Sequence, residues 1–463
     1  MDATSLQLIS QWANGTLAGG EPARTVTRVC TDSRRLRPGD LFIALRGEAF
    51  DGHQFVAAAA QGGAAAAIVD GAYTGEPEPG FTLIRVADTL KALQDIAAAY
   101  RASLPMRVIA LTGSSGKTST KDLLAAVLGR TFRVLKTEGN FNNHIGVPLT
   151  LLSAGVEHEI GIVEMGMNHP GEIAPLAAMA TPESGVITNI GTAHIEFLHS
   201  REGIAEEKGR LAEALPPNGF LILKADDDFS TYIAHRSAAR VITAGIGLGD
   251  FSAEVLETGI SGSRFIVRGK GEEAKVSLPV PGLHMIENAL LALAAGSCHG
   301  IPLSEGALGL AASQLTHGRL EQKKLGGIDF LDDTYNANPD SMRAALRTLA
   351  TLPVKGRRIA VLGRMGELGG ESERGHRSVG AEAAAARVDL LLAVGGAEAG
   401  YLAQSAQAAG LKETRHLPDP AAAAVLLAET VRPGDLVLVK GSRSARMERI
   451  FEHPAFQTTT AEA

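Results

Sequence analysis

The feature that most constrains the fold of this sequence is a repeated alternation of short apolar runs with helical stretches. From Met106 onward the apolar runs are "RVIALTG", "EIGIVEMG", "SGVITNIG" and "GFLILKADD". A second series begins near Arg319, with "GGIDFLDDT", "RRIAVLG", "VDLLLAVGG" and "DLVLVKGS", each followed by an alanine-rich helical stretch. Continuous apolar runs that alternate with helices are typical of βαβ units around a buried parallel sheet. The sequence therefore predicts an α/β protein in which two regions have mostly parallel sheets.

The N-terminal region has a different pattern. Short strand-like runs such as "GDLFIALRG" and "AAAAIVD" lie between Gly/Asp turns, and "DTLKALQDIAAAYRASL" predicts an amphipathic helix that closes the region. At 463 residues the chain is too long for one core, and about 150 residues per domain suggests about three domains. We expect domains over residues 1–104, 105–318 and 319–463.

Charge and composition exclude several classes of protein. The net charge is -7 and no block of Lys or Arg occurs, which argues against a nucleic-acid partner. The N-terminal residues lack the signal-peptide pattern, and no run of about 18 apolar residues suggests a membrane span. Cys30 and Cys298 share no short motif and are expected to be reduced, buried thiols. We therefore expect a cytoplasmic protein.

The stretch "VIALTGSSGKTSTKDLL" at residues 108–124 indicates a phosphate-binding turn between a strand and a helix. In such a turn, backbone N–H groups and a helix N-terminus hold phosphates. Lys117 is then expected to reach the β- and γ-phosphates, and the Thr118 hydroxyl to bind Mg²⁺. The loop residues are Gly113, Ser114, Ser115 and Gly116. The loop is shorter than usual, because the first Gly of G-x-x-x-x-G-K-T would fall on Leu111, and a generic helix cap is the alternative.

Polar residues follow the next two apolar runs. One run ends in Glu164, and the other ends in Asn189 with His194 just past it. Open α/β sheets bind ligands beyond the carboxyl ends of their strands, so Glu164 and His194 are expected to converge with Lys117 and Thr118 on one crevice. A carboxylate and an imidazole beside a phosphate loop would suit Mg²⁺, although the cation prefers oxygen ligands. The alternatives are a helix-capping or salt-bridging carboxylate for Glu164 and a structural histidine for His194.

Lys208 lies in "GIAEEKGRL", which predicts a helix. On spacing alone this residue is a solvated lysine paired with neighbouring acids.

Six stretches together resemble the Mur ligase family, in matching order and across nearly the whole chain. They are "TGSSGKTSTKDLL", "TEGNFNNHIGVPLTLL", "EMGMNHPGEI", "NIGTAHIEFL", "DDTYNANPDSMRAAL" and "VLVKGSRSARME". The resemblance implies an N-terminal domain that binds a UDP-muramoyl peptide, a central P-loop-type ATP-binding domain and a C-terminal Rossmann-like ligase domain. Within the family, "YNANP" and "GNFNNHIGVPLTLL" favour the ligase that adds D-alanyl-D-alanine to UDP-N-acetylmuramoyl-tripeptide.

The implied reaction uses ATP to convert a peptide carboxylate into an acyl phosphate, which the amine of D-alanyl-D-alanine attacks. The products are UDP-N-acetylmuramoyl-pentapeptide, ADP and phosphate, in peptidoglycan precursor synthesis. Two Mg²⁺ ions are implied, because metals and cations must hold two anions together. By resemblance, Glu164 and His194 match magnesium positions, and Lys208 matches a lysine that is carbamoylated and helps to hold the second Mg²⁺.

Further roles are carried over by resemblance alone. Asn288 of "GLHMIENALLALAA" matches an adenine contact, and Arg319 of "HGRLE" matches an arginine that approaches the phosphates. The positions that match the nucleotide side are Tyr335, Asn336 and Asn338; those beside the muramoyl peptide are Asn142 and Asn143; those at the UDP-sugar are Ser33, Arg34 and Arg46. Ordinary loop chemistry is the alternative for the Asn-rich turns, and a plain surface arginine is the alternative for Arg34.

Three positions depart from the family pattern. Met285 stands where Asn is often found, Arg364 where Asp is common, and Arg210 where Glu is frequent. The rival interpretations are a sister ligase that adds the third amino acid, a folylpolyglutamate synthase, and a P-loop nucleotide switch. We expect a monomer, and the third residue of the peptide substrate is left open.

Overall fold

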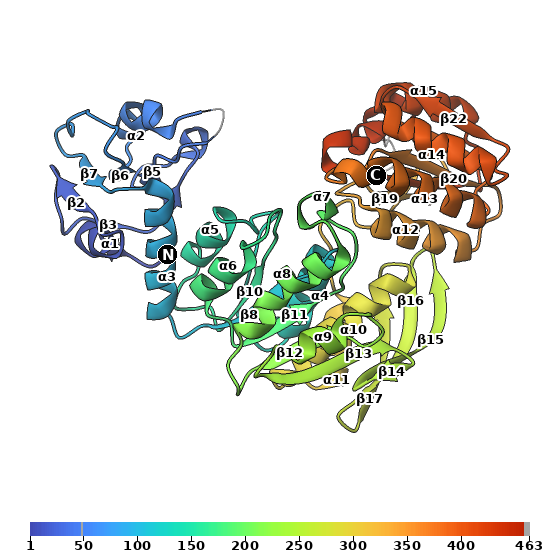
Figure 1. The fold of residues 1–463 in the computed structure, drawn as a ribbon, viewed down its shortest axis with the longest axis horizontal. Helices are drawn as coiled ribbons and strands as arrows, with labels where there is room; N and C mark the ends of the chain where they lie inside the picture. Colours follow the sequence, from blue (N-terminus) through green and yellow to red (C-terminus); the bar gives the residue numbers. More distant parts are fainter. Residues whose placement is uncertain (48–49, 458–463) are drawn as a thin grey trace, which may run out of the picture. The chain divides into compact units, whose positions relative to one another are not determined.

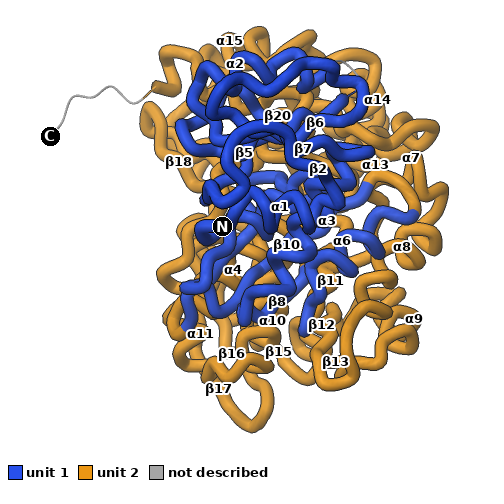
Figure 2. Tube along the Cα trace, turned by 90° about the vertical axis from the view of Figure 1, so that its left-hand side faces the viewer, with its two compact units in different colours: residues 1–110, 132–167, 171–183 blue, residues 111–131, 168–170, 184–463 orange. Residues whose placement is uncertain are grey.

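The structure, a computed structural model, describes residues 1–47 and 50–457 of the 463-residue chain. The chain divides into two compact units, coloured separately in Figure 2. Unit 1 comprises residues 1–110, 132–167 and 171–183, and unit 2 comprises residues 111–131, 168–170 and 184–463. The chain first passes from unit 1 to unit 2 within strand β8 (Arg107–Thr112). The domain boundaries expected after residues 104 and 318 stay predictions.

The N-terminal part of unit 1 is built on a five-stranded sheet of order β2-β7-β6-β5-β4. Its strands are β2 (Thr16–Ala18), β4 (Val29–Cys30), β5 (Leu41–Ile43), β6 (Ala66–Val69) and β7 (Thr82–Arg85). The neighbours from β4 to β7 are parallel, whereas β2 is antiparallel to β7. Phe42, Val56 and Leu83 are buried in the core of this part. The strands expected from "GDLFIALRG" and "AAAAIVD" are confirmed as β5 and β6.

The remaining elements of this part are shorter. They are β1 (Thr4–Ser5), α1 (Leu6–Trp12), β3 (Thr25–Val26), η1 (Ser33–Arg35), η2 (Gly52–Phe55) and α2 (Val56–Gln61). Cys30 is buried and Cys298 is partly buried, and both are free thiols.

Helix α3 (Thr89–Ser103) confirms the predicted amphipathic helix. It begins after Asp88, whose side chain accepts hydrogen bonds from the N–H groups of Leu90 and Lys91. Its buried face includes Leu93, Ile96 and Tyr100, and it packs against α5 (Gly146–Leu152) and α6 (Ile173–Ala180), also in unit 1. Strands β9 (Val134–Lys136) and β10 (Ile160–Glu164) pair in parallel in the same unit.

The first part of unit 2 combines a parallel sheet with antiparallel hairpins (Figure 1). Strands β11 (Ser184–Ile187), β12 (Phe220–Lys224) and β13 (Arg240–Ile246) pair in parallel. Strand β15 (Phe251–Gly259) pairs in parallel with β13, and β16 (Gly262–Gly269) and β17 (Glu272–Leu278) follow as antiparallel neighbours. The short strand β14 (Leu248–Gly249) precedes β15. The other elements are α4 (Lys117–Leu128), α7 (Ile195–Leu198), α8 (Arg201–Glu213), α9 (Ser230–Ala234), α10 (Leu283–Cys298) and α11 (Leu303–Ala311). Helix α4 packs against α10 and α11.

The second part of unit 2 has a six-stranded sheet of order β18-β19-β23-β20-β21-β22. Its strands are β18 (Glu321–Leu325), β19 (Ile328–Asp333), β20 (Arg358–Gly363), β21 (Leu390–Val394), β22 (Thr414–Leu417) and β23 (Leu436–Lys440). Only β18 is antiparallel to its neighbour. The four apolar runs of the second series are thus confirmed as β19, β20, β21 and β23. The helices are α12 (Pro339–Thr351), α13 (Ser372–Ala385), α14 (Ala397–Ala408), α15 (Pro420–Thr430) and the short η3 (Gly369–Glu371), η4 (Arg443–Ala445), η5 (Met447–Glu452) and η6 (Pro454–Phe456).

The α/β class with mostly parallel sheets is confirmed. The four apolar runs of the first series are β8, β10, β11 and β12. Within residues 1–47 and 50–457, no helix combines the length and the apolar character that a membrane crossing requires.

Candidate active site

The predicted phosphate loop joins strand β8 to helix α4, as the sequence suggested. Gly113 and Gly116 adopt φ values of 150° and 77°, which side-chain-bearing residues rarely reach. A Cβ atom at Gly113 would lie 1.8 Å from Thr188 Oγ1, and one at Gly116 would lie 2.6 Å from Asn288 Oδ1. Helix α4 has no side-chain cap at Gly116. The N-terminus of α4 thus keeps the N–H groups that an anion could bind.

Asn189, just beyond β11, fixes the shape of this loop. Its side-chain oxygen accepts hydrogen bonds from Ser114 N (3.1 Å) and Ser115 N (3.0 Å), and its Nδ2 donates to Ser115 Oγ at 2.7 Å. Thr188 Oγ1 donates to the Ser115 carbonyl at 2.6 Å, and Gly191 N donates to Ser114 Oγ at 2.9 Å. The loop is therefore held in place by the segment that follows β11.

Two lysines donate to one carbonyl oxygen of the loop. Lys117 Nζ lies 2.8 Å and Lys208 Nζ 3.0 Å from the oxygen of Gly113. Lys208 projects from α8 and is completely buried, so the interpretation as a solvated lysine is wrong. Burial lowers the pKa of Lys208 well below its ordinary value, and the charge of Lys117 lowers it further, against an opposing effect of Glu207. The sequence argument paired Lys208 with the neighbouring acids of "AEEK" at the surface. Glu207, one of these acids, is itself only 5% exposed.

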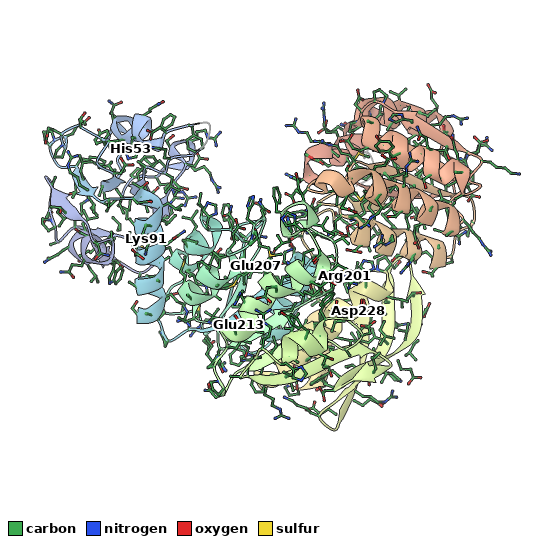
Figure 3. All side chains as sticks on the ribbon, viewed as in Figure 1. His53, Lys91, Arg201, Glu207, Glu213 and Asp228 are labelled. Atoms are coloured by element: carbon green, nitrogen blue, oxygen red, sulfur yellow. The ribbon has the colours of Figure 1, made fainter. Side chains whose placement is uncertain are left out.

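Arg210, one of the departures from the family pattern, lies on the outer side of the same helix. Its guanidinium pairs with Glu206 (2.8 Å) and Glu213 (3.0 Å), and its side chain is 42% exposed. Arg201 at the start of α8 pairs with Asp228 at 2.8 Å. Both residues are labelled in Figure 3. Arg210 is thus engaged in a surface network, which explains how a cation is accommodated at this position.

His194 meets a carboxylate from the C-terminal part of unit 2. Its Nδ1 lies 2.8 Å from Glu367 Oε2, and its side chain is 16% exposed. Burial lowers the pKa of His194, Glu367 opposes the shift, and the charge of Lys117 adds to it. The same contact with His194 lowers the pKa of Glu367. The alternative of a structural histidine is compatible with this pairing, so the metal role of His194 stays a prediction.

Arg319 reaches the start of α4. Its Nη2 donates to Thr118 Oγ1 at 3.2 Å, and its guanidinium carbon lies 4.2 Å from the ring centre of Tyr335. Arg319 Nε is buried and has no hydrogen-bond partner among the described residues. A guanidinium stacked on an aromatic ring with one donor left unused is suited to bind an incoming phosphate oxygen.

The N-terminus of α12 also touches the phosphate loop. Asn338 caps this helix in a capping box with Ser341, and its Nδ2 donates to the carbonyl oxygen of Ser114 at 3.1 Å. Asp340 Oδ2 accepts from both the N–H (2.7 Å) and the hydroxyl (2.9 Å) of Thr192. A Cβ atom at Gly191 would lie 2.2 Å from Asp340 Oδ2, so the approach requires a glycine there. Two elements far apart in sequence are therefore in direct contact beside the loop.

The other residues that were predicted to contact the nucleotide also lie in unit 2. Asn288 of α10 is 7% exposed, and its Nδ2 lies 3.6 Å from the sulfur of Met285, another departure from the family pattern. Asn336 is exposed, and its Oδ1 accepts from Ala337 N at 2.9 Å. Lys440 donates to Asp333 at 2.6 Å and to the Asn336 carbonyl at 3.0 Å, which anchors this turn. The third departure, Arg364, accepts a hydrogen bond from Ser442 N at its carbonyl oxygen, and nothing in the structure explains the arginine side chain.

Glu164, at the end of β10, belongs to unit 1. It is 1% exposed, and its Oε1 accepts from Asn142 Nδ2 at 2.8 Å. Gly166 permits this approach, because a Cβ atom there would lie 2.8 Å from Asn142 Cγ. Asn143 is exposed and accepts from the N–H groups of Ile145 and Gly146, which is ordinary turn chemistry. Asn142 and Asn143 therefore differ in role, although the sequence treats them as a pair.

Unit 1 also holds the residues expected at the UDP-sugar. Ser33 begins η1, and Arg34, with an 86% exposed side chain, pairs with Asp32 at 2.9 Å. Arg34 holds the pKa of Asp32 down to about 2. Arg46 lies between two carboxylates, 3.3 Å from Asp51 and 3.2 Å from Asp70. The exposed cations Arg34 and Arg46 could both meet an anionic ligand, which stays a prediction.

Glu164 has one carboxylate oxygen that a metal ion could bind. Within the described part of the chain, no cluster of three or more His, Cys, Asp or Glu side chains could hold a metal by itself. Mg²⁺ in nucleotide sites, however, is bound by one or two protein oxygens together with phosphates and water. Glu164 Oε2 is buried without a hydrogen-bond partner in that described part, so one carboxylate oxygen is available for such a ligand.

Two contacts of the site were missed by the sequence argument. Asp340 lies in the first turn of α12 and Glu367 on the turn after β20, and each contacts a residue of the segment 192–194. The only signal was their position at the carboxyl ends of parallel strands, where ligand sites of α/β sheets are found.

Three protein-family models match this chain and together cover most of it. A family model described as Mur ligase middle domain matches residues 111–296, and one described as Mur ligase, glutamate ligase domain matches residues 318–443. A third, described as Mur ligase family, catalytic domain, matches residues 25–101. The three-domain composition is thereby confirmed.

Individual relatives match over almost the full length. A protein named UDP-N-acetylmuramoyl-tripeptide--D-alanyl-D-alanine ligase from Bacillus subtilis (strain 168) is 40% identical over 446 residues, covering 96% of each chain. A crystal structure of MurF from Acinetobacter baumannii has a TM-score of 0.88 at 34% identity and covers 98% of each chain. The MurF ligase from Thermotoga maritima in complex with ADP has a TM-score of 0.82 at 29% identity, covering 93% of this chain and 97% of that one. From these matches and the phosphate loop described above, this chain belongs to the Mur ligase family.

Proposed function

We propose that this protein is an ATP-dependent ligase that joins D-alanyl-D-alanine to UDP-N-acetylmuramoyl-tripeptide through an acyl phosphate. The products are UDP-N-acetylmuramoyl-pentapeptide, ADP and phosphate, in peptidoglycan precursor synthesis. The observation that carries the proposal is 40% identity over 96% of the chain to a ligase of that name, together with an intact phosphate loop. A relative of the same fold bound to ADP supports ATP as the nucleotide.

The chemistry requires two anions to approach each other. The γ-phosphate and the peptide carboxylate repel one another, so cations and oriented N–H groups must neutralise the charge that builds up between them. Two cations are proposed to neutralise this charge. They are Lys117, the first residue of α4, and Arg319, whose Nη2 lies 3.2 Å from Thr118 Oγ1. Asn288, Tyr335, Asn336 and Asn338 are the proposed partners of the nucleotide, with Gly113, Ser114, Ser115 and Gly116 forming its phosphate cradle.

Magnesium is part of the proposal. Thr118, Glu164 and His194 are its proposed ligands, and the buried free oxygen of Glu164 supports this assignment. When bound, the ion would polarise the phosphoryl oxygens. Lys208 is proposed to be carbamoylated, because a buried lysine with a lowered pKa supplies the neutral amine that reacts with carbon dioxide. As a carbamate it would help to hold a second magnesium ion.

The substrate side is proposed from the N-terminal region. Ser33, Arg34 and Arg46 would bind the UDP-sugar, and Asn142 and Asn143 would lie beside the muramoyl peptide. A monomer in the cytoplasm is the proposed working state of the enzyme.

The test is phosphate release from ATP with UDP-N-acetylmuramoyl-tripeptide, while the mass of the UDP product is followed. One reaction contains D-alanyl-D-alanine and a parallel one contains a single L-amino acid. A product heavier by one dipeptide, formed only with D-alanyl-D-alanine, is expected. Lys117→Ala should remove most of this turnover, whereas Lys91→Ala, on the exposed face of α3, should not.

Other outcomes would identify the rivals. A product carrying the single amino acid would move the enzyme to a sister ligase. Steady hydrolysis of ATP without either substrate would favour a nucleotide switch.

A further inference from the structure

Four polar side chains of unit 1 form a closed cluster, which we call the Arg46 cluster. It consists of Arg46, Asp51, His53 and Asp70. Arg46 Nε lies 3.3 Å from Asp51 Oδ2, and Arg46 Nη2 lies 3.2 Å from Asp70 Oδ2. His53, labelled in Figure 3, faces the same two acids, with Nδ1 2.6 Å from Asp51 Oδ1 and Nε2 3.4 Å from Asp70 Oδ1. Arg46 and His53 therefore share both carboxylate neighbours.

The backbone brings the members of this cluster together. Arg46 and Asp51 form an isolated antiparallel bridge in the segment after β5. Gly52 N donates to the Leu45 carbonyl oxygen at 2.8 Å, and a Cβ atom at Gly52 would lie 2.6 Å from that oxygen. Asp70 directly follows β6, which is the parallel neighbour of β5. The cluster therefore lies at the carboxyl end of this sheet, where α/β sheets bind their ligands.

His53 is buried, and its hydrogen bonds fix the position of its ring. Its side chain is 7% exposed, and its Nε2 accepts a hydrogen bond from Asp70 N at 3.0 Å. Because Nε2 accepts, Nδ1 carries the ring proton and donates to Asp51 Oδ1. The backbone N–H of His53 donates to the same oxygen at 3.0 Å. One oxygen of Asp51 is thus held by His53, and the other faces Arg46.

We propose that His53 is a positioning residue for Arg46 in the binding of the UDP-sugar, acting through Asp51 and Asp70. The inference rests on the role of Arg46 under the proposed function. The two acids contact Nε and Nη2, whereas a guanidinium has five N–H donors, so these acids leave donors for a ligand.

The benefit of this arrangement is orientation. The side chain of Arg46 is 49% exposed, and a long flexible side chain loses conformational entropy when a ligand orders it. An arginine that is held in place before the ligand arrives binds it at a smaller entropic cost. The acids also offset the positive charge of Arg46, so the cluster contributes direction more than attraction.

The chain offers a matched control in the same unit. His158 Nδ1 accepts a hydrogen bond from Gly155 N at 3.0 Å and lies 3.4 Å from Glu157 Oε1. His158→Ala therefore removes a histidine that also contacts a backbone N–H group and a carboxylate, but outside the Arg46 cluster. His53→Asn is the conservative variant, because its amide nitrogen can still donate to Asp51.

The first experiment measures the binding of UDP-N-acetylmuramoyl-tripeptide to the full-length protein by calorimetry, without ATP. Arg46→Ala should weaken binding about tenfold, as the loss of a hydrogen bond from a charged group does. His53→Ala should weaken it about fivefold, His53→Asn should recover most of this loss, and His158→Ala should bind normally. In the Arg46→Ala background, His53→Ala should have no further effect, because His53 acts through Arg46. An equal loss in both backgrounds, or no loss from His53→Ala alone, would overturn the proposal.

The second experiment separates positioning from a loss of folding. In steady-state assays, His53→Ala should raise the KM for the UDP substrate about fivefold and leave kcat and the KM for ATP unchanged, because the phosphate loop belongs to unit 2. A fall in kcat with an unchanged KM would mark a structural role and contradict the proposal. If the unmodified protein binds the UDP substrate but forms no pentapeptide, the proposed function fails, while the calorimetric comparison still decides the role of His53.

Discussion

Lys117 and Lys208 place two amine nitrogens on the carbonyl oxygen of Gly113. Two charged ammonium groups this close would repel each other, and Lys208 has no exposure to solvent to screen the repulsion. The pKa of Lys208 is therefore lowered, first by burial and then by Lys117. Burial and the neighbouring charge therefore both favour the neutral form of Lys208.

A neutral buried amine leads to a prediction about modification. Protein equilibrated with ¹³C-bicarbonate near neutral pH should show one carbamate signal by NMR, and Lys208→Gln should lack it. The reason is that only the unprotonated amine attacks carbon dioxide, and the lowered pKa of Lys208 favours that form. A carbamate signal that persists in Lys208→Gln, or its absence from the unmodified protein, would contradict the assignment.

His376 leads to a prediction about stability and pH. Burial lowers its pKa from the ordinary value, with a smaller contribution of the same sign from Arg364 and opposing contributions from the Ser372 carbonyl and Glu398. The unfolded chain then takes up a proton at about pH 6.5 while the folded protein does not. The stabilisation by neutral His376 is therefore complete above about pH 6.5 and is lost as the pH falls towards the lowered folded value.

The measurement compares melting temperatures at pH 7.5 and 5.5. The fall on acidification should be smaller in His376→Gln than in the unmodified protein, because glutamine does not titrate. His317→Gln is the control, since that side chain is 95% exposed. Equal falls in His376→Gln and the unmodified protein would show that His376 has no part in the acid sensitivity.

At the residue scale, the sequence predicted the phosphate loop well because its glycines, Lys117 and Thr118 are adjacent in the chain. It failed for Lys208, since the burial of one face of α8 depends on packing and not on the neighbouring acids. Asp340 and Glu367 were missed for a related reason. Their partners Thr192 and His194 are more than a hundred residues away, and a single sequence shows no such pairing.

At the element scale, the turn after β11 and the N-terminus of α12 act on the phosphate loop together. Asp340 accepts a hydrogen bond from Thr192 N, and Gly191 N donates to Ser114 Oγ. The side chain of Asn338 donates to the carbonyl oxygen of Ser114. The turn over residues 188–194 therefore connects the loop to α12 and carries His194. Its rigidity should matter for nucleotide binding.

Asp340→Ala tests this connection. Loss of two hydrogen bonds to a carboxylate should cost about 1.5 kcal/mol or more in the local opening equilibrium, which is about a tenfold faster amide exchange at Thr192. Hydrogen exchange followed by mass spectrometry over residues 188–194 measures the effect. Asp419→Ala is the control, because Asp419 caps another helix, α15, where its side chain accepts a hydrogen bond from Ala422 N. Unchanged exchange in Asp340→Ala would show that the turn is held by its other contacts.

The elements themselves were predictable to different degrees. Strands β19, β20, β21 and β23 are continuous apolar runs because a parallel sheet is covered on both faces. The hairpins β15 to β17 were not predicted, since their burial alternates along the strands and polar residues such as Glu254 and Arg268 occur within them. A half-exposed antiparallel strand gives a weaker signal than a buried parallel one.

At the scale of the whole molecule, the residues assigned to the two large substrates lie in different compact units. The cations Arg34 and Arg46 belong to unit 1, whereas the phosphate loop, Arg319 and Asn338 belong to unit 2. We therefore expect the nucleotide to bind to unit 2 and the UDP-muramoyl peptide to bind to unit 1, each in the absence of the other.

Hydrogen exchange with each ligand alone tests this separation. A non-hydrolysable ATP analogue with Mg²⁺ should slow exchange over residues 113–121 and 334–341, because bound phosphates accept the loop N–H groups and stabilise the start of α12. UDP-N-acetylmuramoyl-tripeptide should instead slow exchange over residues 31–47. D-alanyl-D-alanine alone is the control and should protect neither segment. Protection of residues 31–47 by the nucleotide, with none over the phosphate loop, would place the nucleotide in the wrong unit and contradict the assignment of both substrate sites.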